Sequence, residues 1–159
     1  DDDIVIDIKS INMMFDTAKK YNLLICGPSF VRPSIISHRI TYHKPNILLT
    51  YTNFVEVNVP LFNKTALQKL MTVLDPGLIG WGIDFLYIWA NGLNNPQAYA
   101  IIHHIKCINP QPTKKKYKKR ELTILPNCSQ RAAIWQQYAR KIGCPHRTIL
   151  REYASIILK

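Results

Sequence analysis

The residues best suited to chemistry lie in the segment Gly80-Trp81-Gly82-Ile83-Asp84, which opens a short apolar stretch. A carboxylate such as Asp84 can act as a general base when it is held near a reacting hydroxyl. The two glycines let the backbone come close to a ligand, and the Trp81 ring offers that ligand a flat wall. The simpler interpretation is that Asp84 caps the helix predicted after it, and the two roles are compatible.

A second candidate is the acidic triplet Asp1, Asp2 and Asp3. Adjacent carboxylates repel one another unless a cation holds them, and ligand sets made only of oxygen suit Mg²⁺ or Mn²⁺. The alternative is a solvated acidic segment without a specific role. Spacing alone favours that alternative.

Three further polar side chains interrupt apolar segments. Glu56 lies on the polar side of the alternating segment 54–61, a predicted half-buried strand, and it either lines the pocket of Asp84 or faces water. His103 and His104 are consecutive in a predicted strand, so they point to opposite faces and at most one serves a given site. For each histidine, a solvated or core-bound side chain is the simpler interpretation.

The order of the strands and helices expected around these residues predicts an α/β domain. Its mixed sheet is flanked by helices, and a helical appendage follows at the C-terminal end. Strands are predicted where short segments are apolar or alternating: 23–26, 35–42, 47–52, 54–61 and 100–108. Helices are predicted where apolar residues recur at helical spacing: after a cap at Ser10, over 64–74 with Asn63 as cap, over 85–91 before Gly92, from Ser129 to Gly143, and from Pro145 to Leu158.

Length and composition indicate one globular domain, since the 159 residues are 47% apolar and 10% aromatic. No apolar run approaches the length of a membrane span. Four cysteines are too widely spaced to indicate a zinc site, and they are predicted to be buried free thiols: Cys26, Cys107, Cys128 and Cys144.

The net charge of +11 belongs entirely to the last third of the chain. Residues 1–105 hold eight basic and eight acidic residues, whereas residues 106–159 hold thirteen basic residues and two glutamates. Six of the seven residues from Lys114 to Arg120 are basic, which predicts a linker or an exposed edge. Such a cluster can also contact nucleic acid or an anionic surface without sequence specificity.

Several of these motifs share one order and spacing, which resembles a plant and bacterial family whose plant members are labelled "lysine-ketoglutarate reductase trans-splicing related". That family is similar to glycosyltransferases of the GT-A fold. The resemblance covers about residues 1 to 112. It rests on four motifs: Asp-Asp-Asp-Ile at 1–4, Pro-Ser-Phe at 28–30, Thr-Asn-Phe-Val-Glu-Val at 52–57 with Pro-Leu-Phe at 60–62, and Gly-Trp-Gly-Ile-Asp-Phe at 80–85.

The resemblance implies a GT-A-like domain that is incomplete at its N-terminus, because the acidic motif lies about midway through such domains. It implies that Asp1 and Asp3 bind Mn²⁺ or Mg²⁺ on the diphosphate of a nucleotide-sugar donor. It also implies that Asp84 takes the proton of the acceptor hydroxyl. The implied substrate-binding residues are Asn53, Glu56, Gly80, Trp81 and Gly82.

These expectations divide the chain into a catalytic-half domain at 1–112, a basic linker at 113–120 and a helical extension at 121–159. They leave two functions open. One is metal-dependent transfer of a sugar from a nucleotide-sugar to a hydroxyl, which depends on Asp1, Asp3 and Asp84. The other is a non-catalytic binding module whose basic segment at 114–120 attaches to nucleic acid or an anionic surface.

Overall fold

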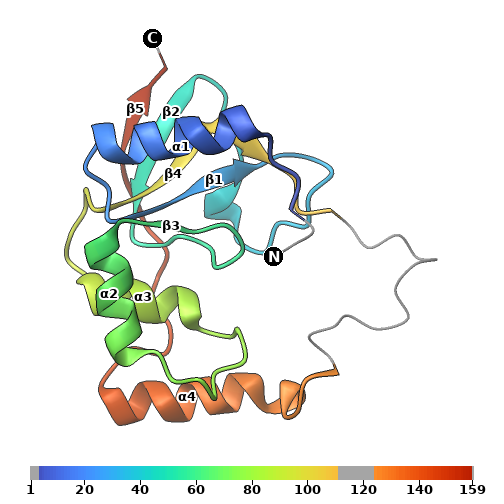
Figure 1. Cartoon of the computed structure of the whole chain (residues 1–159), viewed down its shortest axis with the longest axis vertical. Coiled ribbons are helices and arrows are strands. Elements are labelled where there is room, and N and C mark those ends of the chain that lie inside the picture. Colours follow the sequence, from blue (N-terminus) through green and yellow to red (C-terminus); the bar gives the residue numbers. More distant parts are fainter. Residues whose placement is uncertain (1–3, 111–123, 159) are drawn as a thin grey trace.

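The computed structural model describes residues 4–110 and 124–158. Its centre is a five-stranded mixed sheet with the strand order β3-β1-β4-β2-β5 (Figure 1). β1 and β4 run parallel, and the other neighbouring strands are antiparallel. The predicted class, an α/β fold with a mixed sheet, is therefore confirmed. The strands are β1 (Ile25–Phe30), β2 (Ile47–Thr52), β3 (Leu61–Phe62), β4 (Tyr99–Cys107) and β5 (Glu152–Ile157).

Four α-helices and two short 3₁₀ helices accompany the sheet in the described parts of the chain. They are α1 (Ile8–Lys20), η1 (Arg39–Thr41), α2 (Lys64–Val73), α3 (Ile83–Asn91), η3 (Cys128–Gln130) and α4 (Arg131–Ile142). Helix α1 packs against β1 and β4, while α2, α3 and α4 gather at the opposite end of the molecule (Figure 1). Across the described residues, no helix combines the length and the apolar character needed to cross a bilayer.

Two hydrophobic clusters fill the interior. One lies under α1 and includes Met14, Leu49 and Ile102. The other joins the sheet to α2, α3 and α4, and Tyr87 and Trp135 are its largest fully buried members. Because α4 contributes Trp135 to this cluster and β5 pairs with β2, residues on both sides of 111–123 belong to one packed unit.

The predicted helix ends agree best with the structure. The Asn63 side chain accepts a hydrogen bond from the Ala66 N–H at 2.7 Å, which confirms it as the cap of α2. Gly92 and Gly143 end α3 and α4 as predicted. The first helix begins earlier than predicted, because Asp7 rather than Ser10 is its N-cap and accepts from the Ser10 N–H at 2.8 Å.

Three predicted elements are wrong. Residues 35–42 hold the 3₁₀ helix η1 instead of a strand, and residues 53–60 form an irregular loop. That loop buries Phe54, Val55 and Glu56 consecutively, which a strand with one wet face cannot do. The segment predicted as a final helix contains β5, because the free edge of β2 supplies backbone groups that need partners.

Candidate active site

The turn before α3 carries Asp84 into the protein. Gly82 is the N-cap residue of α3 and has a left-handed backbone with φ of 81°. A Cβ atom at Gly82 would lie 2.2 Å from the ring of Trp135, so both the backbone and the packing require glycine there. Asp84 follows in the first turn of α3 and is only 8% exposed.

Asp84 is held by the start of its own helix. One carboxylate oxygen accepts a hydrogen bond from the Phe85 N–H at 3.0 Å, although Gly82, not Asp84, is the N-cap. Burial raises the pKa of Asp84 to about 6, and the hydrogen bond from Phe85 only partly opposes that rise. A carboxylate with such a pKa is ionised at neutral pH and still basic enough to accept a proton.

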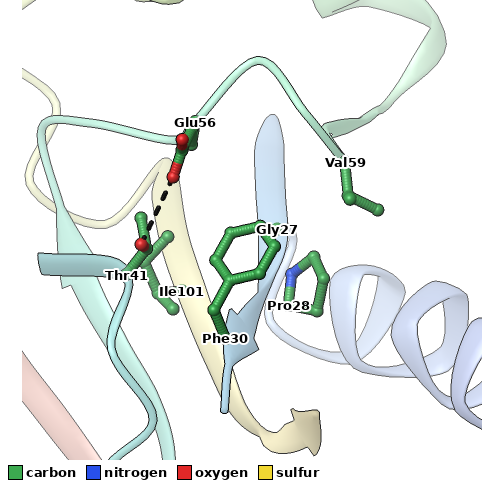
Figure 2. Close-up of a pocket in the computed structure, with 7 residues that line it drawn as sticks. All are labelled: Gly27, Pro28, Phe30, Thr41, Glu56, Val59 and Ile101. Carbon is green, nitrogen blue, oxygen red and sulfur yellow. Dashed lines mark hydrogen bonds between the residues drawn. The ribbon is translucent and has the colours of Figure 1, made fainter. Parts of the chain in front are cut away.

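A second buried acid, Glu56, lies in the loop between β2 and β3. It lines a narrow crevice that leaves no room for a water molecule (Figure 2). The other lining residues come from β1, η1, the same loop and β4: Gly27, Pro28, Phe30, Thr41, Val59 and Ile101. Glu56 is 7% exposed, so its side chain faces protein rather than water.

Two hydrogen bonds from neighbouring side chains hold the Glu56 carboxyl group. Its Oε1 accepts from the Asn58 amide at 2.9 Å, and its Oε2 lies 3.3 Å from Thr41 Oγ1 (Figure 2). Thr41 Oγ1 also lies 2.9 Å from the carbonyl oxygen of His38. A threonine hydroxyl has one proton, so Thr41 donates to Glu56 or to the His38 carbonyl, but not fully to both at once.

Burial and hydrogen bonding act on the pKa of Glu56 in opposite directions. Burial raises it to about 7, against hydrogen bonds from Thr41, Ser37 and Asn58, and the charge of Asp84 raises it further. At neutral pH, Asp84 is therefore mostly ionised, whereas Glu56 holds a proton about half of the time. Burial therefore makes both carboxyl groups harder to ionise than exposed ones.

Tyr87 connects α3, which carries Asp84, to the loop that carries Glu56. Its hydroxyl donates to the carbonyl oxygen of Val55, directly before Glu56 in the chain, and Tyr87 itself is one helical turn after Asp84. Burial raises the pKa of Tyr87 well above its usual value, and the charges of Asp84 and Glu56 add to the rise. This phenol therefore stays protonated and fixes α3 to the loop at 53–60.

The other predicted substrate-binding residues fall into two groups. Trp81 is 43% exposed, and the Arg131 guanidinium lies over its ring at 5.1 Å from the centroid, which leaves only the opposite face for a ligand. Gly80 is exposed beside it, with φ of 68°. Asn53 instead uses its amide to hold the backbone of Ile149 and of Arg151 at 2.8 and 2.7 Å.

The two histidines of β4 point to opposite faces, as predicted. His103 is fully buried, with Nδ1 accepting from the Lys44 N–H at 3.2 Å and Nε2 lying 3.1 Å from Thr50 Oγ1. Burial lowers the pKa of His103 to about 4, so the ring is neutral and both nitrogens are occupied. His104 contacts Thr17 on α1. The simpler interpretation, a core-bound histidine, is confirmed for His103.

Two predicted sites lie outside the described residues: the metal ligands Asp1 and Asp3, and the basic segment at 114–120. Within residues 4–110 and 124–158, no group of three or more His, Cys, Asp or Glu side chains could hold a metal ion. The chain matches no family model, no curated protein and no solved structure. The resemblance to glycosyltransferases therefore stays a prediction.

Both acids were predicted from the sequence, but two groups of their surroundings were missed: Thr41, which contacts Glu56, and Tyr87, which donates to the carbonyl oxygen of Val55. Thr41 lies in a segment predicted as a strand, and Tyr87 belongs to an apolar helix face without a distinguishing pattern. Near Thr41, the sequence offers only the polar residues Ser37, His38 and Arg39 inside an otherwise apolar segment. No local signal existed for Tyr87.

The raised pKa of Glu56 predicts a specific pH dependence of stability. Because the folded protein binds the proton more tightly than the unfolded chain, this group's contribution is complete below about pH 4.5 and is lost as the pH rises towards 7. The side chain of Glu56→Gln cannot ionise. The free energy of unfolding of this variant, relative to wild type, should therefore be about 3 kcal/mol higher at pH 8 than at pH 4. Urea unfolding at both pH values measures this difference.

The amide of Glu56→Gln can donate to Thr41 and accept from Asn58, so the substitution keeps the contacts. His103, whose pKa is lowered, changes stability with pH in the opposite direction, but it is present in both proteins and cancels in the difference. Asp16→Asn, on the exposed side of α1, is the matched control and should follow wild type. A difference that does not vary with pH would show that Glu56 titrates normally.

Proposed function

We propose that this protein transfers a sugar from a nucleotide-sugar donor to a hydroxyl acceptor, with Asp84 as the general base. The observation that carries the proposal is the buried Asp84 carboxylate, with its pKa raised to about 6, behind the left-handed turn at Gly82. It is the residue that the resemblance to GT-A enzymes independently selects. A general base of this kind acts best when its pKa lies near the working pH.

The surroundings of Asp84 support a sugar as the ligand. Trp81 exposes part of its ring three residues before Asp84, and flat apolar faces suit the apolar face of a pyranose. Glu56 lies close enough to Asp84 for the charge of Asp84 to raise its pKa, so the two buried acids share one region of the protein.

The proposed reaction also uses a divalent cation, Mn²⁺ or Mg²⁺, with Asp1 and Asp3 as its ligands. Such a cation would offset negative charge on the diphosphate that leaves. The residues of the described part of the chain act without it on the acceptor side, where Asp84 orients the hydroxyl and removes its proton.

The test is an assay of nucleoside diphosphate release from a panel of nucleotide-sugars, with sugar and polyol acceptors and with Mn²⁺ present. Because only ionised Asp84 can accept a proton, the rate should rise with pH and level off with an apparent pKa of about 6. Release that needs no acceptor would indicate hydrolysis instead of transfer. No release with any donor would contradict the proposal, and so would a rate that does not change between pH 5 and pH 8.

A further inference from the structure

An open groove separates η1 and the residues after it from the start of β5. Its volume is about 860 Å³, within the range of about 300–1,000 Å³ that ligand pockets occupy. One wall comes from η1 and the segment that follows it, and the other from the C-terminal segment. The lining residues are Arg39, Ile40, Tyr42, His43, Lys44, Leu150 and Glu152.

The charges in this groove are not balanced. Lys44 forms an ion pair with Glu152, the one carboxylate among the lining residues. It is also the sole ion pair within the described ranges, so Arg39 has no carboxylate partner there. Arg39 is exposed, and its guanidinium is always charged. The groove therefore carries one cation without a counter-charge.

The walls are held in place before any ligand arrives. The Lys44 N–H donates to His103 Nδ1 at 3.2 Å, and the His43 N–H donates to the Phe30 carbonyl at 3.0 Å. On the other side, Thr50 Oγ1 and Ser155 Oγ lie 2.9 Å apart and join β5 to the sheet. A site that is already ordered loses less entropy on binding.

We propose that this groove binds a small molecule that joins an oxyanion, a phosphate or a carboxylate, to an apolar or aromatic group. Arg39 receives the oxyanion, because the planar guanidinium fork matches two oxygen atoms at once. Tyr42, whose side chain is 39% exposed, and Leu150 receive the apolar part. The site uses none of the groups assigned to sugar transfer, and it stands whether or not that transfer occurs.

The probes are phenyl phosphate, phenylacetate and neutral benzyl alcohol, titrated up to millimolar concentrations against the ¹⁵N-labelled protein. At least one of the two anions should shift amide signals at 39–44 and 150–152, and benzyl alcohol should not. The comparison of phosphate with carboxylate identifies which oxyanion the site prefers. Binding of neither anion, or equal binding of the alcohol, would overturn the proposal.

Two substitutions should change affinity in opposite directions. Arg39→Gln should weaken anion binding at least about 10-fold, the effect of losing one charge-assisted contact. Glu152→Gln leaves Lys44 without its partner and should strengthen anion binding several-fold. Arg140→Gln, an exposed arginine on α4, is the control and should leave affinity unchanged. Equal losses in Arg39→Gln and Arg140→Gln would show only general charge attraction, and weaker binding in Glu152→Gln would contradict the assignment.

Discussion

Gly82→Ala is expected to lower the free energy of unfolding by about 3 kcal/mol or more, from the summed costs of overpacking and of a left-handed backbone. The added Cβ would lie 2.2 to 2.4 Å from three ring atoms of Trp135, a distance at which the ring must move. Trp135 is 1% exposed and sits in the cluster beneath α3, so little room exists for that movement. Urea or thermal unfolding of the purified variant measures the loss.

Gly80→Ala is the matched control, because Gly80 also has a left-handed backbone but has no atom within 4 Å of the position of an added Cβ. It should lose only the backbone part of the effect, about 1 to 2 kcal/mol. The difference between the two variants isolates the contact with Trp135. Equal losses in both variants would mean that the packing of α4 against the Gly82 turn does not contribute.

The same variant tests the candidate active site. If the Trp135 ring moves, the turn that carries Asp84 moves with it, because Gly82 and Asp84 lie two residues apart in the first turn of α3. Any transfer activity should therefore fall in Gly82→Ala by more than the folded fraction falls. Activity that follows the folded fraction would show that the turn tolerates the shift.

Asp84→Asn is expected to reduce the rate of sugar transfer about 10²- to 10⁴-fold, the usual contribution of a general base. The amide keeps the shape of the carboxylate and can still accept from the Phe85 N–H, but it cannot take a proton. Donor binding should remain close to wild type, because the base acts only while the proton moves. Transfer rate and donor affinity are measured on the same preparation.

Stability gives Asp84 a second and independent readout. Keeping a buried carboxylate ionised at pH 7 is unfavourable when its pKa is raised from 3.8 to about 6, so Asp84→Asn should raise the free energy of unfolding by up to about 3 kcal/mol. If Asp84 were needed only for folding, the substitution would lower the free energy of unfolding instead. Higher stability with lower activity is the pattern expected of a buried group kept for function.

Asp84→Ala completes the comparison, because it also removes the acceptor for Phe85. It should be as inactive as Asp84→Asn but less stable than it. If Asp84→Asn is fully active while Asp84→Ala only lowers the melting temperature, Asp84 serves the start of α3 and not catalysis. That result would also remove the main support for sugar transfer.

The sequence by itself determined the elements whose cause is local. Asn63, Gly92 and Gly143 each satisfy backbone groups within a few residues, so the helix ends that they mark could be read directly. The strands β2 and β4 were also readable, since each begins with a short continuous hydrophobic run, at 47–49 and at 99–102. The local motif at 80–84 also pointed to Gly82 and Asp84.

Only the tertiary structure decided the rest, because the deciding interactions join residues far apart in the chain. Residues 152–157 carry a pattern that also suits a helix, but the free edge of β2 selects the strand. The alternating sequence places Glu56 on the polar face of a predicted strand, whereas the folded protein buries it beside Thr41 in a loop. The environments that raise the pKa of Glu56 and Asp84 come from burial, and burial depends on contacts that no single stretch of sequence contains.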